Sequence, residues 1–196
     1  MQKLPNKTLI IDVANLLFRA AATQNSKYGG PDLTIEDRIG LSLHVSLLSV
    51  NKWFNKIAPE FVVFAFEGDN NWRKTYTKNA DSRRQYKGNR VKDPEMEHYY
   101  RMLVDFRTII KDFTSICCLH VDTMEGDDVI AGFCQLYADD THEITIVSGD
   151  KDFTQLLKLP NVKLVNPDNG ALRNQPNDKD YTEDLDYWLF RKCIKG

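Results

Sequence analysis

The sequence lacks the features of membrane-spanning and disulfide-stabilised proteins. None of its apolar runs approaches the roughly 20 residues that a transmembrane helix needs. There are only four cysteines and no Cys-x-x-Cys pair, and the adjacent Cys117 and Cys118 would point to opposite faces of one strand. The first residues show no signal peptide. We therefore expect a cytoplasmic protein with reduced thiols and no membrane contact.

Histidine is scarce as well, which argues against several kinds of catalytic site. The four histidines are scattered along the chain, and each is expected to be structural or exposed: His44, His98, His120 and His142. No Ser-His-Asp or Cys-His arrangement and no zinc-ligand spacing is recognisable. Any chemistry must therefore rest on other side chains.

Net charge is also nearly absent, but the total of −2 hides a strong asymmetry. The segment from Arg73 to Lys92 holds eight Lys or Arg residues and one acid, so it carries +7 and the rest of the chain −9. Such a segment could be a solvated surface loop. It could also be an arm that binds a nucleic-acid backbone through its cations and stacks unpaired bases on Trp72, Tyr76 or Tyr86. Because residues 70–92 show no clean period, we interpret them as a mobile or arch-like connection.

Short apolar runs alternate with amphipathic segments along the chain. Five runs are predicted to be buried strands, at residues 8–12, 61–66, 116–121, 144–148 and 162–165. Helices are predicted at residues 14–22, 39–57, 96–113, 127–137, 153–157 and 185–194. Thr34 and Asp37 resemble a capping box before the second helix, and Asp93-Pro94 is typical of a helix start. This alternation predicts an α/β fold with a mostly parallel sheet covered on both faces.

Carboxylates follow four of the predicted strands. They are Asp12, Glu67 with Asp69 close behind, the group Glu125, Asp127 and Asp128, and the pair Asp150 and Asp152. Each acid alone could be a helix cap or a turn residue. The carboxyl ends of parallel strands share one edge, however, so together these acids predict a crowded acidic site.

A crowded acidic site predicts a metal centre. Neighbouring carboxylates repel one another unless they are protonated or bound to a cation. Oxygen ligands without His or Cys favour Mg²⁺ or Mn²⁺. Two such ions about 4 Å apart can activate water and stabilise the leaving oxygen in phosphoryl transfer.

Four segments, in order and well spaced, resemble the 5′-nuclease superfamily of flap endonucleases, DNA polymerase I 5′-nuclease domains and phage 5′-3′ exonucleases of the RNase H type. The phage members are the most similar. The segments are LIIDVANLLFR at 9–19, YKGNR at 86–90, MEGDD at 124–128 and VSGDKDFTQL at 147–156. The resemblance implies a three-layer, PIN-like fold in one catalytic domain, residues 1–196, with a basic helical arch at about residues 70–95.

The resemblance also implies roles for individual residues. The metal-site acids would be Asp12, Glu67, Glu125, Asp127, Asp128, Asp150 and Asp152, with Asp12 and Asp150 counted among the catalytic residues. Lys87 would approach the scissile phosphate, supported by Arg90 and Arg73. The nucleic-acid-binding residues would be Arg73, Lys74, Arg83, Arg84, Tyr86, Lys87 and Arg90.

The sequence departs from the family pattern at two places. Family members usually have Asp where this chain has Glu67, so Asp69 is the second candidate for that ligand. The chain also stops at Gly196, where a Gly-Asp-x-x-Asp-Asn segment and a helix–hairpin–helix region would follow. We expect a truncated chain without that DNA-binding region, and therefore with fewer ligands for a second ion.

The function implied by the resemblance is that of a 5′-3′ exonuclease and flap endonuclease that removes RNA primers during replication. It would use Mg²⁺ or Mn²⁺, with two ions in the full-length protein. It would act as a monomer on 5′-flap DNA and RNA–DNA hybrids, in the host cytoplasm if a phage encodes it. A single-strand-binding protein or a polymerase is a candidate partner. The alternatives are a PIN-type ribonuclease and a non-catalytic fragment that binds branched nucleic acid.

Overall fold

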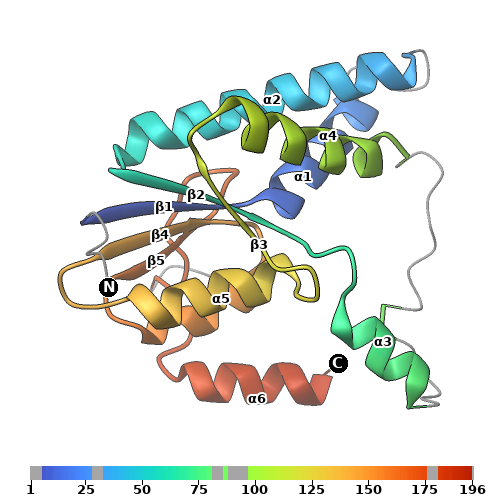
Figure 1. Ribbon diagram of the computed structural model, residues 1–196. Helices are drawn as coiled ribbons and strands as arrows, with labels where there is room; N and C mark the ends of the chain where they lie inside the picture. Colours follow the sequence, from blue (N-terminus) through green and yellow to red (C-terminus); the bar gives the residue numbers. More distant parts are fainter. Residues whose placement is uncertain (1–5, 28–32, 81–85, 88–96, 176–180, 196) are drawn as a thin grey trace.

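A five-stranded parallel sheet with the order β3-β2-β1-β4-β5 forms the centre of the protein (Figure 1). The computed structural model describes residues 6–27, 33–80, 86–87, 97–175 and 181–195. The strands are β1 Lys7–Asp12, β2 Phe61–Phe66, β3 Cys117–His120, β4 Glu143–Val147 and β5 Val162–Val165. All four neighbouring pairs are parallel, as the apolar runs predicted.

Helices cover both faces of the sheet, which confirms the predicted three-layer fold. On one face lie α1 Val13–Lys27, α2 Ile35–Ile57 and α4 Glu97–Phe113, and on the other lie α5 Gly126–Tyr137 and the 3₁₀ helix η3 Lys151–Lys158 (Figure 1). Alternate strand residues point to opposite faces, so Leu9 and Ile11 pack against the first set of helices and Ile10 against the second. Helix α6, Leu185–Lys195, packs outside η3.

The second helix begins at the capping box that the sequence predicted. The Asp37 amide donates to Thr34 Oγ1 at 3.1 Å, and the Thr34 amide donates to Asp37 Oδ2 at 3.3 Å. The helix ends at Ala58, which has a left-handed φ of 46° and donates its amide to the Phe54 carbonyl at 2.8 Å. The other predicted helix start, Asp93-Pro94, lies outside the described residues.

Part of the basic segment is helical. The family resemblance implied a helical arch in this region, whereas the residues alone predicted only a mobile or arch-like connection. Helix α3 spans Trp72–Asn79, and its N-cap residue Asn71 accepts a hydrogen bond from the Arg73 amide at 2.9 Å. The helix stands apart from the layers, beyond the carboxyl ends of the strands (Figure 1). None of its residues is buried. It therefore needs no apolar stripe, and the sequence shows no helical period.

Membrane-spanning helices and disulfides are both absent from the described residues. Over the described ranges, no helix is both long enough and apolar enough to cross a bilayer. All four cysteines are free thiols, with Cys134 buried and Cys193 exposed.

Candidate active site

The candidate site lies where the chain changes from one face of the sheet to the other. Strands β1 and β4 are neighbours, but β1 leads into α1 on one face and β4 into η3 on the other. The carboxyl ends of the strands at such a switch point form the usual ligand crevice of open α/β sheets. Asp12 ends β1 and Asp150 follows β4, so both acids lie at this point.

Asp12 is the buried centre of the site. Its side chain accepts hydrogen bonds from Ser148 Oγ at 2.7 Å and from the Asn15 amide at 3.1 Å, and the residue is 5% exposed. Burial raises the pKa of Asp12 from 3.8 to about 6, although both hydrogen bonds act to lower it. The charges of Asp150 and Glu67 raise this pKa further, so both carboxylates act on Asp12.

Asp127, in the first turn of α5, joins the same group. Its pKa is raised from 3.8 to about 7. The largest cause is the loss of solvation, and the next are the negative charges of Asp12, Asp150 and Glu125. Three loops therefore contribute carboxylates that repel one another. Asp127 is exposed, and water weakens the effect of these charges at its carboxyl group. The buried Asp12 is thus the firmer indicator of how the site responds to pH.

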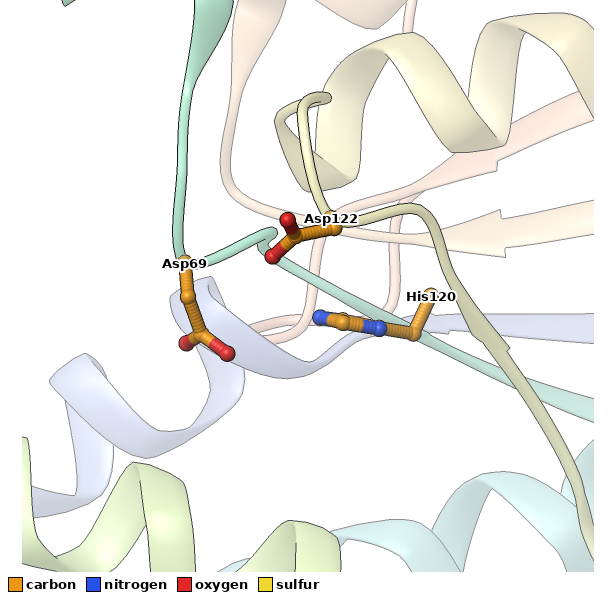
Figure 2. A group of neighbouring side chains, drawn as sticks. All are labelled: Asp69, His120 and Asp122. Atoms are coloured by element: carbon orange, nitrogen blue, oxygen red, sulfur yellow. The ribbon is translucent and has the colours of Figure 1, made fainter.

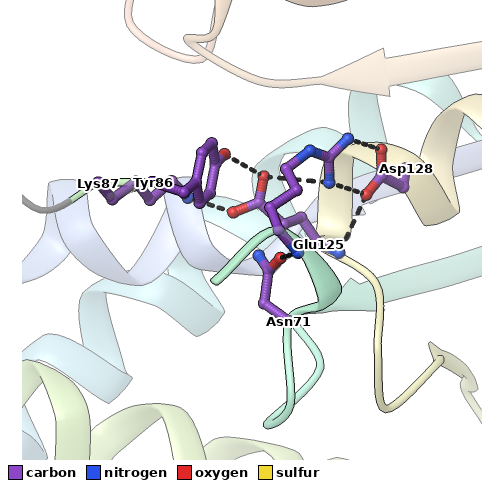
Figure 3. A network of polar contacts seen from close by, with 6 residues as sticks. Asn71, Tyr86, Lys87, Glu125 and Asp128 are labelled. Carbon is purple, nitrogen blue, oxygen red and sulfur yellow. Dashed lines mark hydrogen bonds and ion pairs between the residues drawn. The ribbon is translucent and has the colours of Figure 1, made fainter. Parts of the chain in front are cut away.

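Glu125 is held by the basic segment (Figure 3). Tyr86 donates its hydroxyl to Glu125 Oε2 at 2.6 Å, and Lys87 Nζ forms an ion pair with Oε1. Arg73 Nη1 lies 3.6 Å from Oε2. Burial alone would raise the pKa of Glu125, but these hydrogen bonds and positive charges keep it below its ordinary value. Lys87 adopts a left-handed φ of 55°, which is uncommon for a residue other than glycine.

Arg73 binds the neighbouring acid as well. Its guanidinium donates two hydrogen bonds to Asp128, at 2.5 and 2.7 Å, which lowers the pKa of Asp128. Asp128 Oδ2 in turn accepts from the Glu125 amide at 3.3 Å and so fixes the start of α5. Arg73 therefore positions Asp128, and this carboxylate already has a cation.

The loop after β2 brings Glu67 and α3 to this site. It runs along the β3–α5 loop, with amide-to-carbonyl hydrogen bonds from Gly68 to Met124 at 2.8 Å and from Trp72 to Thr123 at 2.9 Å. A Cβ on Gly68 would lie 2.2 Å from the Asp122 carbonyl oxygen. Sequence reasoning did not single out Gly68, because only the approach of the two loops reveals its role.

The two acids after β4 have different surroundings. Asp150 caps η3 by accepting from the Asp152 amide at 2.8 Å. Asp152 forms an ion pair with Lys192 of α6, and both side chains are about half exposed. The predicted metal-site acids thus fall into two sets. Asp12, Glu67, Asp127 and Asp150 are linked by mutual repulsion, whereas Glu125, Asp128 and Asp152 are paired with protein cations.

A second cluster lies outside this group. Asp69, His120 and Asp122 are exposed, and their ligand atoms lie within 4.8 Å of one another (Figure 2). Arg107 already contacts Asp69 Oδ2 at 3.3 Å and His120 Nε2 at 3.0 Å, so a cation would have to displace it. Asp69, the second candidate for the strand-two ligand, therefore lies in this cluster, whereas Glu67 acts on Asp12.

The chemistry of the donor set fits a hard divalent cation at the first site. Its acids offer only oxygen ligands, and burial, followed by neighbouring negative charges, raises the pKa values of Asp12 and Asp127, so a cation would favour their ionised forms. Over the described ranges, their ligand atoms are not gathered within 4.8 Å as those of the second cluster are. The Asp12 carboxylate is held instead by the Ser148 hydroxyl and the Asn15 amide.

The remaining predicted residues are distributed around this site. Lys74 is exposed on α3, whereas Arg83, Arg84 and Arg90 lie outside the described residues. The histidines are structural or exposed, as expected. For example, His142 is buried and lies 2.7 Å from Thr8 Oγ1. The position of His120 beside Asp69, which lies far from it in the chain, had no signal in the sequence.

Fold and site together define a class, that of doubly wound α/β proteins with a carboxylate cluster at the switch point and a cationic segment closed onto it. Residues 7–185 match the model of a specific family, the 5′-3′ exonuclease N-terminal resolvase-like domain. The chain belongs to this family, which confirms the resemblance seen in the sequence.

Individual relatives agree with this assignment. Flap endonuclease Xni of Shewanella denitrificans is 32% identical over 154 residues, which are 78% of this chain and 54% of that protein. Ribonuclease H of Enterobacteria phage T4 is 36% identical over 87 residues, 42% of this chain and 28% of the relative. The chain thus spans about half the length of Xni and less than a third of the length of the phage protein. Both relatives are nucleases.

Solved structures show the same fold. T5 5′-exonuclease with bound divalent metal ions (zinc) superposes with a TM-score of 0.63 at 15% identity, over 93% of this chain and 64% of that one. The shared architecture confirms the predicted PIN-like fold.

The raised pKa values predict a pH-dependent affinity for divalent cations. A cation needs ionised ligands, and Asp12 and Asp127 hold protons up to pH values of about 6 and 7. Mg²⁺ affinity should therefore rise with pH through this range and then level off, with protons released at pH 6 but almost none at pH 8.5. Calorimetry in buffers of different ionisation enthalpy measures that release. Proton release that is equal at both pH values would contradict the prediction.

The same shifts predict how the stability of the metal-free protein changes with pH. The folded state binds these two protons more tightly than the unfolded state, in which the carboxyl pKa is near 3.8. The contribution of these two groups therefore falls as pH rises from about 4 to about 7. Asp127→Asn should flatten this dependence in urea titrations at several pH values.

Proposed function

We propose that this chain carries the catalytic centre of a divalent-metal-dependent 5′ nuclease that hydrolyses phosphodiesters in 5′-flap DNA and in RNA primers on DNA. The observation that carries the proposal is that the charges of Asp12 and Asp150 act on Asp127 at the switch point, and that Lys87, which also acts on Asp127, is paired with Glu125. Family membership supports the nuclease chemistry.

The acids would hold Mg²⁺ or Mn²⁺, with Glu67 as the fourth carboxylate of the group. A bound ion supplies a water of lowered pKa and positive charge for the leaving oxygen. Two ions are proposed, one to activate the water and one to stabilise the leaving oxygen.

The basic residues have separate proposed tasks. Lys87 forms an ion pair with Glu125, and we assign its ammonium to stabilise the charge that would develop on a phosphate bound at these acids. Arg73 is committed to Asp128 and acts as a positioning residue. Lys74, Arg83, Arg84 and Arg90 are assigned to the nucleic-acid backbone, with Arg90 also supporting Lys87. The protein is proposed to act as a monomer, with a polymerase or a single-strand-binding protein as candidate partner.

A panel of substrates tests this function. The expected result is cleavage of 5′-flap DNA and of an RNA-primed DNA duplex with Mg²⁺, and no cleavage with EDTA. Gel analysis of 5′- and 3′-labelled strands identifies the products. Cleavage confined to single-stranded RNA would favour the PIN-type ribonuclease. Binding of branched DNA without cleavage of any substrate would favour the non-catalytic alternative.

A further inference from the structure

Helix α3 presents two aromatic rings to solvent beside the candidate site. Trp72 is 47% exposed and Tyr76 65% exposed, and their ring centroids lie 6.3 Å apart. Isolated exposed aromatics are common on protein surfaces, so exposure alone indicates little. Here, however, the helix carries Arg73, Lys74 and Lys78 and no acid, which attracts a polyanion to the same surface.

Tyr86 is less accessible for base stacking than the aromatic rings of α3. Its hydroxyl is bound to Glu125, and Lys87 Nζ and the Arg73 guanidinium lie 5.3 and 5.9 Å from its ring centroid. The residue is half-buried, whereas Trp72 and Tyr76 are exposed. Among these three aromatic residues, Trp72 and Tyr76 therefore offer more ring surface to a ligand than Tyr86 does.

The Trp72 ring is also held in place relative to the acids. Its backbone amide donates to the Thr123 carbonyl at 2.9 Å, and the Arg73 guanidinium lies 4.8 Å from its ring centroid. The same guanidinium contacts Glu125 and Asp128. The guanidinium of Arg73 therefore connects the Trp72 ring to two carboxylates of the site. The ring is thus already in position beside the acids before a strand binds there.

We propose that Trp72 and Tyr76 form a stacking platform for unpaired bases of single-stranded DNA or RNA next to the scissile phosphate. The position of that phosphate rests on the proposed function. Stacking on an aromatic ring tolerates any base, so the platform binds the strand without reading its sequence. The platform favours an unpaired strand over a duplex, in which bases already stack on one another.

An abasic strand separates stacking from charge. The full chain is titrated, in EDTA, with a fluorescein-labelled oligothymidine and with an abasic strand of equal length and charge. Trp72→Ala should weaken oligothymidine binding about 5- to 100-fold and leave binding of the abasic strand unchanged. Tyr76→Ala should act in the same direction, whereas Trp72→Phe should retain most of the affinity.

Lys74→Ala is the matched control on the same helix. It removes one positive charge and no ring, so it should weaken both strands equally and reduce the salt dependence of binding. Since no residue of α3 is buried, circular dichroism melting should be the same for these variants and the parent chain. A second readout is tryptophan fluorescence, because stacking on Trp72 quenches an emission that Trp72→Phe lacks.

Two outcomes would overturn the platform. Equal weakening of both strands by Trp72→Ala would assign its role to local structure or charge. Unchanged binding of both strands by Trp72→Ala would show that the aromatic face does not bind these strands and would favour a partner of another class, such as an acidic protein. Binding in EDTA does not depend on hydrolysis. Base-dependent binding without cleavage would therefore support the stacking platform and contradict the proposed nuclease function. Cleavage without base-dependent binding would support the nuclease function and contradict the platform.

Discussion

Asp150→Asn is expected to reduce Mg²⁺-dependent cleavage of 5′-flap DNA by roughly a thousandfold, because a catalytic metal ion contributes several kcal/mol to transition-state stabilisation. Asparagine keeps the oxygen that caps η3, where Asp150 Oδ1 accepts from the Asp152 amide at 2.8 Å. It removes the charge that acts on Asp12 and Asp127. Single-turnover cleavage measures the loss, and fluorescence anisotropy in EDTA should show that DNA binding is retained.

The control for this variant is Asp140→Asn. Asp140 is exposed in the turn before β4, at the amino end of the strand and so at the opposite edge of the sheet. Cleavage by this variant should equal that of the parent chain. If Asp150→Asn cleaved at the parental rate with the same Mg²⁺ dependence, Asp150 would have no part in the metal site.

Gly68→Ala is expected to destabilise the protein by about 2 kcal/mol or more and to impair cleavage as well. The added methyl group would meet the carbonyl oxygens of Asp122 and Val121 at 2.2 and 2.3 Å, so one of the two loops must move. That movement displaces Glu67 on one side of Gly68 and α3 on the other. Urea denaturation measures the stability, and the flap assay measures the activity.

Two other glycines provide controls of opposite sign. Gly40 in α2 and Gly132 in α5 have no atom within 4 Å of an added Cβ. Alanine at either position should stabilise the protein by roughly 0.5–1 kcal/mol, because glycine is unfavourable inside a helix. Equal stability of Gly68→Ala and the parent chain would show that the two loops can separate without loss.

Much of the architecture could be predicted from the sequence because it follows from local pattern. The run Phe61–Phe66 is β2 from end to end, and Thr34 and Asp37 form the expected capping box. Helix α3 could not be predicted from local pattern, since a two-turn helix without a buried residue leaves no apolar period, and only the family resemblance implied a helical arch in this region. Its start depends on the side chain of Asn71 and on contacts with a loop about 50 residues away.

The sequence allowed us to predict which acids lie at this edge of the sheet, but not which cation each acid contacts. A parallel sheet places the acids that follow its strands at one edge, so the group could be anticipated. Which acid meets which cation depends on side chains distant in sequence. Arg73 with Asp128 and Lys87 with Glu125 are such pairs. The same limit applies to Glu67 and Asp69, which are two residues apart but act in different clusters.

The contact of Lys87 and Tyr86 with Glu125 has a consequence for the order of events at the site. The segment that would meet DNA is already closed onto a carboxylate that would meet a metal ion. An incoming ion that takes Glu125 as a ligand must displace the ammonium, which is then free for a phosphate. Under the proposed function, ion and DNA affinities are therefore expected to be linked, with each ligand changing the affinity of the other by the same factor.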